Sequence, residues 1–216
     1  MSFGGPASST EETACNNAYN AGLTLIAASG NENTSVSYPA AYANVIAVGA
    51  TNKDDARVDL GSGSGSNYGP ELDVVAPGYL IYATDWDGVT PNRYSNEYWG
   101  TSYSSPITAG LAGLLKSEYS NLENDEIREI LRSTADDLGP PGRDDYYGHG
   151  RINVYNALHH ATAGHLLISE VQVAGGVADD EFIELHNPTG AAVDISGWSI
   201  QYREGTATTY TKKNFT

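Results

Sequence analysis

Two uninterrupted apolar runs constrain the fold of this chain more than any other feature of its sequence. The runs LTLIAA (23–28) and NVIAVGA (44–50) have the length of strands and contain no alternating polar residues. Such strands are buried on both faces, as in a parallel sheet that helices cover on both sides. We therefore expect an α/β fold, with further short strands at LDVVAPG (72–78) and YLIYAT (79–84) and a flexible Gly/Ser loop at 61–66.

Three helices are predicted around this sheet. The first covers residues 9–21, because Ser9 and Glu12 form a capping-box pattern at its start. The second covers residues 102–118 and the third covers residues 124–138. Strands that alternate with helices in this way predict parallel connections.

The sequence pattern changes after residue 158. The segments HLLISEVQVAGG, DEFIELHNPTG and VDISGWSIQYRE alternate apolar and polar residues, with turn residues between them. Such alternation is typical of antiparallel strands. We therefore expect a first domain over residues 1–160, a linker over 161–165 and a second domain over 166–216.

The charge balance narrows the range of partners. The chain has 27 acidic and 11 basic residues and a net charge of −16, so it lacks the basic surface that nucleic acids and anionic membranes require. No apolar run approaches the ~20 residues that span a bilayer, and no membrane insertion is expected. The single cysteine, Cys15, cannot form an internal disulfide and is expected to be a small core residue.

The stretch WGTSYSSPITAG (99–110) places a hydroxyl at the start of a predicted helix that is rich in small residues. The free N–H groups and the dipole of a helix N-terminus stabilise negative charge nearby. Ser102 is therefore well placed to be a nucleophile, because its attack on a carbonyl creates an oxyanion. Serine is also a favoured helix cap, so an ordinary capping role is the alternative on these residues alone.

A set of sequence blocks distinguishes these alternatives. The helix start reads Gly100-Thr101-Ser102, with Pro106 four residues after the serine, and the other blocks occur in a fixed order around it. Together the blocks resemble the subtilisin-like serine proteases (subtilases) over residues 1–158, which implies part of a three-layer α/β fold with a parallel sheet. The blocks are SFGG (2–5), AASGN (27–31), YPAAYANVIAVGAT (38–51), YGPELDVVAPG (68–78), GTSYSSP (100–106) and YYGHGRINVYNAL (146–158).

The resemblance implies a serine endopeptidase that works through a Ser-His-Asp triad and an acyl-enzyme. Ser102 would be the nucleophile, and the side-chain amide of Asn31 would donate to the oxyanion together with the Ser102 N–H. Without the resemblance, Asn31 would be interpreted as a turn residue that follows Gly30.

The resemblance also implies an extended polypeptide substrate, which would pair with the SFGG backbone as an added strand. Ser37 would lie at the floor of the specificity pocket and make it shallower, and the Tyr38–Pro39 peptide bond would be cis. The walls of the pocket would be Ser2, Phe3, Gly4, Ala28, Ser29 and Gly30.

The triad is incomplete in this sequence. All five histidines follow Ser102, whereas the family has the order Asp, His, Ser. We therefore expect this chain to be a fragment, with the Asp and His blocks and a signal peptide upstream of Met1. Without those blocks the chain would lack a general base and would be inactive alone.

No cofactor is expected for the chemistry itself. The carbonyls around Ala40, Tyr42 and Val45 resemble the weak cation site of the family, and backbone oxygens suit a structural calcium ion. The absence of any metal is the alternative, because sequence does not reveal where carbonyls point.

The tail resembles the opening strands of a lamin-tail domain, an all-β immunoglobulin-like sandwich. The resemblance implies an extracellular or cell-surface protein, with association to the surface or wall through the tail. A non-catalytic surface or binding protein on a degenerate protease scaffold is the alternative function. The residues that carry the resemblance are Ile168-Ser169-Glu170, Phe182–Leu185, Asn187, Asp194 and Ser196-Gly197-Trp198.

Overall fold

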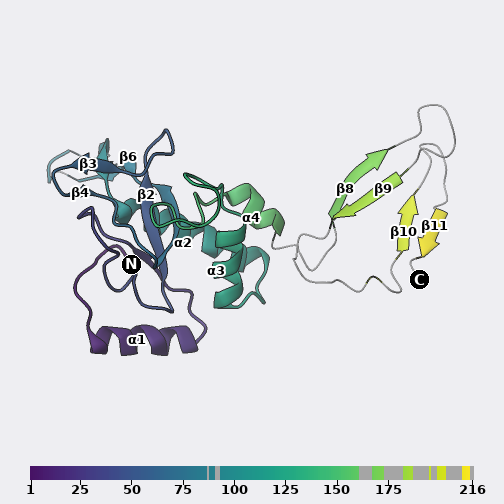
Figure 1. The fold of residues 1–216 in the computed structure, drawn as a ribbon, viewed down its shortest axis with the longest axis horizontal. Helices are drawn as coiled ribbons and strands as arrows, with labels where there is room; N and C mark the ends of the chain where they lie inside the picture. The colour runs from purple at the N-terminus through teal and green to yellow at the C-terminus, as the bar shows by residue number, and fades with distance from the viewer. Residues whose placement is uncertain are drawn as a thin grey trace. The chain divides into compact units, whose positions relative to one another are not determined.

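The chain forms two compact units, Met1–Ala161 and Thr162–Thr216 (Figure 1). The structure is a computed structural model, and it describes residues 1–86, 88–90, 93–160, 167–172, 182–186, 195, 199–202 and 211–214. The predicted linker 161–165 lies outside the described residues, and so do Asn187, Asp194 and Trp198 of the tail.

A parallel sheet of three strands forms the centre of the first unit. Its order is β1 (Ile26–Ala28), β2 (Ile46–Thr51) and β5 (Leu72–Pro77). Every residue of β1 and β2 is buried, which confirms the inference from the uninterrupted apolar runs. Strand β1 is shorter than predicted because the turn after the first helix extends to Leu23, whose N–H donates to the Ala18 carbonyl.

Side chains of the sheet alternate between two apolar layers. Ile46 and Val48 pack in one layer with Leu115, whereas Ala47 packs in the other with Cys15, which is buried as expected. The second helix runs across the sheet and contacts all three strands (Figure 1). The helices of this unit are α1 (Ser9–Asn20), α2 (Thr101–Glu118), α3 (Asn124–Ser133) and α4 (Val154–His160).

Two helix boundaries differ from the predictions. Ser8, and not Ser9, is the N-cap of α1, because the Ser8 Oγ accepts a hydrogen bond from Glu11 N at 3.5 Å. Helix α3 ends five residues before position 138, because the chain turns into an isolated bridge between Asp136 and Arg151.

A buried carboxylate attaches α3 to the sheet. Asp73 of β5 has a fully buried side chain, and it accepts from Ala47 N of β2 at 2.7 Å. Its other partners are Arg128 Nε at 2.9 Å and Arg132 Nε at 2.7 Å, both from α3. A buried carboxylate needs such compensation, because an unpaired one would pay a large desolvation penalty.

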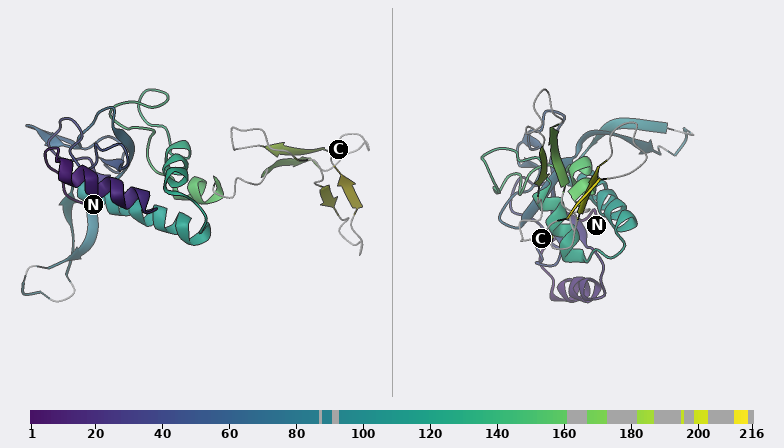
Figure 2. Two further views of the ribbon diagram at one scale, coloured as in Figure 1. Left: turned by 90° about the horizontal axis from the view of Figure 1, so that it is seen from below. Right: turned by 90° about the vertical axis from the view of Figure 1, so that its right-hand side faces the viewer.

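Two antiparallel hairpins extend from the sheet. Strands β3 (Asp59–Gly61) and β4 (Ser64–Gly65) occupy the Gly/Ser run that was predicted to be a loop. Strands β6 (Tyr79–Asp85) and β7 (Arg93–Trp99) form a hairpin that projects from the unit (Figure 2, teal strands). Strand β7 was not predicted, because its sequence RYSNEYW has no apolar alternation.

The described strands of the second unit pair antiparallel, in agreement with the alternating sequence pattern. Strand β8 (Leu167–Gln172) pairs with β9 (Phe182–His186), and β10 (Ser199–Tyr202) pairs with β11 (Thr211–Asn214). Within the described ranges of both units, none of the helices combines the length and the hydropathy that crossing a bilayer demands.

Candidate functional site

Ser102 is the second residue of α2, at the point where the β6–β7 hairpin ends. Gly100 makes this turn with a φ of 133°, and a Cβ on it would lie 3.2 Å from the Asn31 amide nitrogen. Its N–H donates to the Gly78 carbonyl at 2.7 Å. A residue with a side chain would be strained here, so glycine lets the helix begin directly against Asn31.

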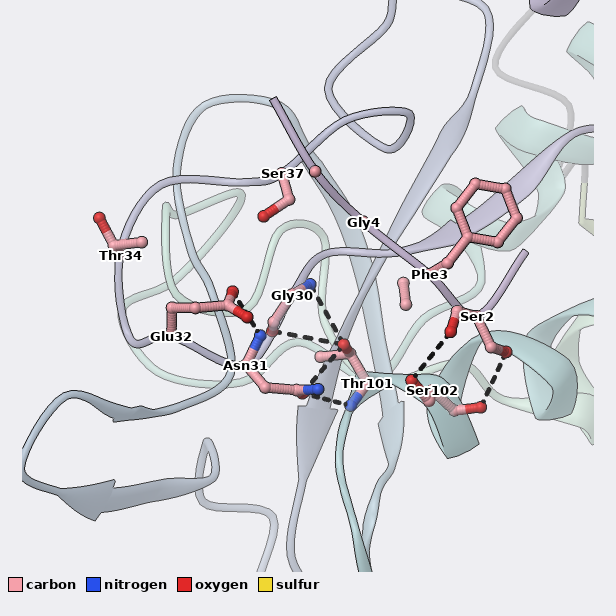
Figure 3. Close-up of a pocket in the computed structure, with 12 residues that line it drawn as sticks. Ser2, Phe3, Gly4, Gly30, Asn31, Glu32, Thr34, Ser37, Thr101 and Ser102 are labelled. Atoms are coloured by element: carbon pink, nitrogen blue, oxygen red, sulfur yellow. Dashed lines mark hydrogen bonds between the residues drawn. The ribbon is translucent and has the colours of Figure 1, made fainter. Parts of the chain in front are cut away.

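A proline four residues after Ser102 changes the hydrogen bonding of this helical turn. Pro106 has no N–H, so the Ser102 carbonyl lacks its usual helical donor. The Ser2 hydroxyl donates to that carbonyl instead, at 3.0 Å. The Ser102 hydroxyl in turn donates to the Ser2 carbonyl at 3.3 Å (Figure 3). The first helical turn and the start of the chain are thus joined by reciprocal bonds.

The side-chain amide of Asn31 is oriented by Thr101. The Asn31 Oδ1 accepts from Thr101 N at 2.8 Å and from Thr101 Oγ1 at 3.1 Å. With the oxygen side so engaged, the Nδ2 group of Asn31 makes no hydrogen bond to any residue that the structure describes. The Ser102 N–H belongs to the first helical turn, whose donors have no partner within the helix. These two unpartnered donors are what an oxyanion requires.

A cavity of about 370 Å³ lies beside Ser102 (Figure 3). The structure brings nearly all of the predicted substrate-binding residues to it. Ser29 is the exception, because its side chain is fully buried and donates to the Asn67 carbonyl at 3.2 Å, behind the cavity. The lining residues are Ser2, Phe3, Gly4, Gly5, Ala28, Gly30, Asn31, Glu32, Thr34, Ser37, Thr101 and Ser102.

The segment 1–5 forms an extended edge along the cavity. Met1 pairs with β1, donating to the Ile26 carbonyl at 2.5 Å and accepting from Ala28 N at 3.0 Å. Gly5 exchanges two backbone hydrogen bonds with Tyr38. Between these anchors, residues 2–4 make no backbone–backbone hydrogen bond to the described part of the chain. Apart from the Ser2 carbonyl, which accepts from the Ser102 hydroxyl, their backbone groups can bind an extended peptide as an added strand.

The opposite side of the cavity is held by Asn67, which is fully buried. Its Oδ1 accepts from Glu32 N at 2.9 Å and from Thr34 N at 3.1 Å. Its Nδ2 donates to the Glu32 carboxylate at 2.9 Å and to the Ser37 hydroxyl at 3.2 Å. One buried amide therefore fixes the whole loop. The Tyr38–Pro39 bond that follows is cis, as the resemblance predicted.

Thr101, Glu32 and Asn67 are among the residues of the site that were not identified from the sequence. Thr101 and Glu32 are each adjacent to a predicted catalytic residue, so their position in the motif was an available signal. Asn67 lies 35 residues from Glu32 in the chain, and no local pattern links the two.

A stacked tyrosine pair flanks Ser102. Tyr103 stacks on Tyr98 of β7, with ring centroids 5.7 Å apart. A hydrogen bond to Asp85, together with burial, raises the pKa of Tyr98 above its ordinary value. Asp85 also forms an ion pair with Arg93 at 2.5 Å. The hairpin thereby presents a neutral aromatic surface beside the helix start.

No described side chain acts as a base on Ser102, because the hydrogen bond of its hydroxyl goes to the Ser2 carbonyl. His149 donates its backbone N–H to Asp73, and burial and the nearby Arg132 lower its pKa. His159 stacks on Tyr155 of α4. Neither the His149 nor the His159 side chain is among the residues that line the cavity beside Ser102.

Two of the three backbone oxygens proposed for a cation, those of Tyr42 and Val45, already accept hydrogen bonds. The Tyr42 carbonyl accepts from Val45 N at 3.0 Å, and the Val45 carbonyl accepts from Arg128 Nη2 at 3.2 Å. The Arg128 guanidinium therefore already supplies a positive charge at the Val45 carbonyl. Ala40, the third residue proposed for the site, is buried. Calcium takes about six to eight oxygen ligands, so this donor set does not fit it. Among the described residues, no three His, Cys, Asp or Glu side chains form a metal cluster.

Comparison with known proteins shows which families the two parts of the chain resemble. Residues 1–150 match the Subtilase family, and residues 159–216 match the Lamin Tail Domain. A thermophilic serine proteinase from Bacillus sp. (strain AK1) is 45% identical over 150 residues, which cover 69% of this chain and 34% of that protein. Subtilisin DY from Bacillus licheniformis is 41% identical over 160 residues, covering 71% and 54% respectively. The chain thus spans between a third and just over half of the length of these relatives.

Solved structures show the same fold. The crystal structure of a lanthipeptide protease has 26% sequence identity and a TM-score of 0.61, covering 69% of this chain and 54% of that one. The psychrophilic subtilisin-like protease Apa1 from Pseudoalteromonas sp. AS-11 has 20% identity and a TM-score of 0.64, covering 75% and 69%, and this likeness concerns the fold alone. Because the family match covers more than half of the chain and agrees with the fold, the chain belongs to the subtilase family.

Proposed function

We propose that this chain carries the nucleophile and the oxyanion donors of a serine endopeptidase that cleaves extended polypeptides. One observation carries the proposal: Ser102 and the unpartnered Asn31 Nδ2 flank a single cavity at the start of α2. An ordinary helix cap needs no side-chain amide directed at the same cavity.

The chemistry follows from these positions. The Ser102 Oγ attacks the peptide carbonyl while a general base takes its proton, which forms the new C–O bond and a tetrahedral oxyanion. Asn31 Nδ2 and Ser102 N donate to that oxyanion. The C–N bond then breaks, the amine leaves with the proton, and water hydrolyses the acyl-enzyme in the same way. In this family, the loss of the asparagine donor costs ~10²–10³ in rate, which is the documented example of the effect.

The general base must come from a segment other than the described residues. In the order typical of the family, Asp and His blocks precede the serine block, so we place the base in an upstream segment of the protein. The 216-residue chain alone would then bind peptides without hydrolysing them at enzymatic rates.

The substrate would lie along residues 2–4, with its backbone paired to the unpaired groups there. An extracellular location and surface association through the lamin-tail unit complete the proposal, and they rest on the matches to the Subtilase family and the Lamin Tail Domain. The calcium site is not included, because its donor set does not fit.

A fluorophosphonate probe tests the assignment of Ser102. In a protein that joins this chain to the Asp and His blocks of its reading frame, we expect rapid labelling that Ser102→Ala abolishes. Asn31→Ala should slow the labelling ~10²-fold while the fold persists. Labelling that survives Ser102→Ala would refute the nucleophile.

A non-catalytic binding protein is the second candidate. The observation in its favour is that the Ser102 hydroxyl already has a partner, the Ser2 carbonyl, and no base among the described side chains. An upstream frame without Asp and His blocks, together with peptide binding that Ser102→Ala leaves unchanged, would establish this alternative.

A further inference from the structure

A row of exposed apolar side chains lies on one face of the β6–β7 hairpin, which projects from the first unit (Figure 2). Residues of β6 alternate between half-buried and exposed positions, and the exposed ones include Leu80 and Tyr82. Trp86 continues the alternation just after the strand, and both it and Tyr82 are 71% exposed. A two-stranded hairpin is at best marginally stable alone, and an exposed apolar face of this kind is typical of a contact with another protein surface.

The neighbouring strand adds a third ring to this face. Tyr94 of β7 pairs with Thr84 in the register, and its ring stacks on that of Tyr82 with centroids 5.7 Å apart and planes inclined by 13°. Tyr94 is itself 55% exposed, so the stacked pair leaves ring surface open to solvent. We define the hairpin face as the four exposed residues Leu80, Tyr82, Trp86 and Tyr94.

The hairpin face contains no charged residue, although the chain as a whole is strongly acidic. Asp85 and Arg93, which pair across the hairpin, occupy the opposite positions of the alternation and form an ion pair at 2.5 Å. Two copies of a chain with a net charge of −16 repel each other over most of their surface. The hairpin face is therefore a place where this repulsion opposes contact least.

The order of side chains along the hairpin face is similar in both directions. Leu80 and Trp86 lie at its two ends, which the rise of a strand separates by about 20 Å, and the stacked pair of Tyr82 and Tyr94 lies between them. In a copy turned about a two-fold axis through the middle of the face, Leu80 lies against the partner's Trp86 and the two tyrosine pairs meet at the centre. A two-fold contact requires a self-complementary surface of this kind.

The area of the hairpin face suits a weak, reversible dimer. Aromatic side chains bury about 150–250 Å² each when they are fully covered, and each residue of the hairpin face is more than half exposed. Two hairpin faces in contact would therefore remove roughly 1,000 Å² from water. This area lies at the lower limit for a specific interface, where association is weak and transient.

We propose that two copies of this chain associate through the hairpin face, with the hairpins packed against each other about a two-fold axis. The inference is independent of the proposed function, because the residues of the hairpin face do not line the cavity beside Ser102. A saccharide would need several polar groups beside the rings, and apart from the tyrosine hydroxyl, Thr84 supplies the one polar side chain at an exposed position of β6. The order of side chains along the face favours a second copy instead.

Sedimentation equilibrium of the 216-residue chain tests the proposal. We expect a monomer–dimer equilibrium with a dissociation constant in the micromolar range. Association should become stronger as added salt screens the repulsion between the two acidic copies. A contact built on ion pairs would respond to salt in the opposite way, because screening weakens the attraction between opposite charges.

Two tyrosines of nearly equal exposure provide matched variants. Tyr82→Asp places a charge from each copy at the centre of the contact, so it should weaken the dimer at least about tenfold. Tyr155→Asp adds the same charge on α4, where the residue is 69% exposed, and it should leave the dissociation constant unchanged.

A third variant, Trp86→Ser, removes the largest ring of the hairpin face without changing a residue of β6. It should also weaken the dimer by about tenfold or more. Urea unfolding should show that all three variants keep the native fold, because each substitution is made at an exposed position.

The results that overturn the proposal are equally specific. A native chain that stays monomeric at millimolar concentration would refute it, and so would native dissociation constants in both Tyr82→Asp and Trp86→Ser. Leu114 is exposed on α2, so a dimer that only Leu114→Asp weakens would assign the contact to that helix. Open-ended oligomers in place of a dimer would exclude a two-fold contact.

Discussion

The two walls of the cavity are built in opposite ways. The loop wall (residues 30–37) is fixed by side chains that are themselves buried, Asn67 and Thr101. The strand wall (residues 1–5) is held by backbone bonds at its two ends, and its Phe3 is 59% exposed. In the proposed function, the loop wall carries the Asn31 donor that meets a developing charge. The strand wall makes few backbone hydrogen bonds, which suits the proposed pairing with a substrate.

Gly30→Ala should have the largest effect, because it forces a methyl group into the loop wall. Its Cβ would lie 2.2 Å from the buried Asn67 Nδ2, and the φ of +109° strains any residue with a side chain. Steric overlap and backbone strain together should lower the free energy of unfolding by about 3 kcal/mol. Urea unfolding of the variant measures this loss.

A substitution at a second glycine, Gly22, separates steric overlap from backbone strain as causes of the lost stability. Gly22 has a φ of +83°, but a Cβ on it would meet nothing within 4 Å. Gly22→Ala should therefore show the strain alone, about 1 kcal/mol. Equal losses at the two positions would mean that the packing against Asn67 does not hold the loop wall.

Thr101→Val should have an intermediate effect. The Thr101 hydroxyl accepts from Gly30 N at 3.1 Å and donates to the Asn31 Oδ1, and the residue is fully buried. An isosteric valine leaves Gly30 N without its acceptor, which should cost about 2 kcal/mol. The side-chain amide resonances of Asn31 should also shift, because one of the two donors that orient it is lost.

The matched control is Thr13→Val on α1. The Thr13 hydroxyl donates to the Ser9 carbonyl at 2.8 Å, but it is exposed to solvent. Its loss should change stability by no more than about 0.5 kcal/mol. Asn31 resonances that stay in place in Thr101→Val would contradict the orienting role of Thr101.

Ser2→Ala should have the smallest effect, because it acts on the strand wall. It removes the donor to the Ser102 carbonyl, which lies in an exposed contact and can bind water instead. We expect a change within about 0.5 kcal/mol in urea unfolding. A loss as large as that of Thr101→Val would erase the distinction between the two walls.

The fold was predictable where a residue pattern reports burial directly. The runs at 23–28 and 44–50 predicted a parallel sheet because both faces of a central strand must be apolar, and β1 and β2 are buried throughout. The β7 strand was missed because it lies in a projecting hairpin, where no apolar alternation is required. The cap of α1 differed by one residue because Ser8 and Ser9 satisfy the same local pattern.

The site was predictable only in part, for a physical reason. Ser102 and Asn31 stand in ordered blocks, and the structure brings both to one cavity. Asn67 fixes the loop through a hydrogen bond to Glu32, which lies 35 residues away in the chain. No local sequence pattern predicts such a contact. Ser29 was assigned to the pocket wall from the family resemblance, but its buried hydroxyl donates to the Asn67 carbonyl.

Pro106 deprives the first turn of α2 of one backbone hydrogen bond. In a helix without proline, the carbonyl of Ser102 would accept a hydrogen bond from the N–H of residue 106. Pro106 lacks that N–H, and the Ser2 hydroxyl of the strand wall donates to the Ser102 carbonyl instead. A displacement of residues 1–5 would therefore act directly on the backbone of Ser102 through this hydrogen bond.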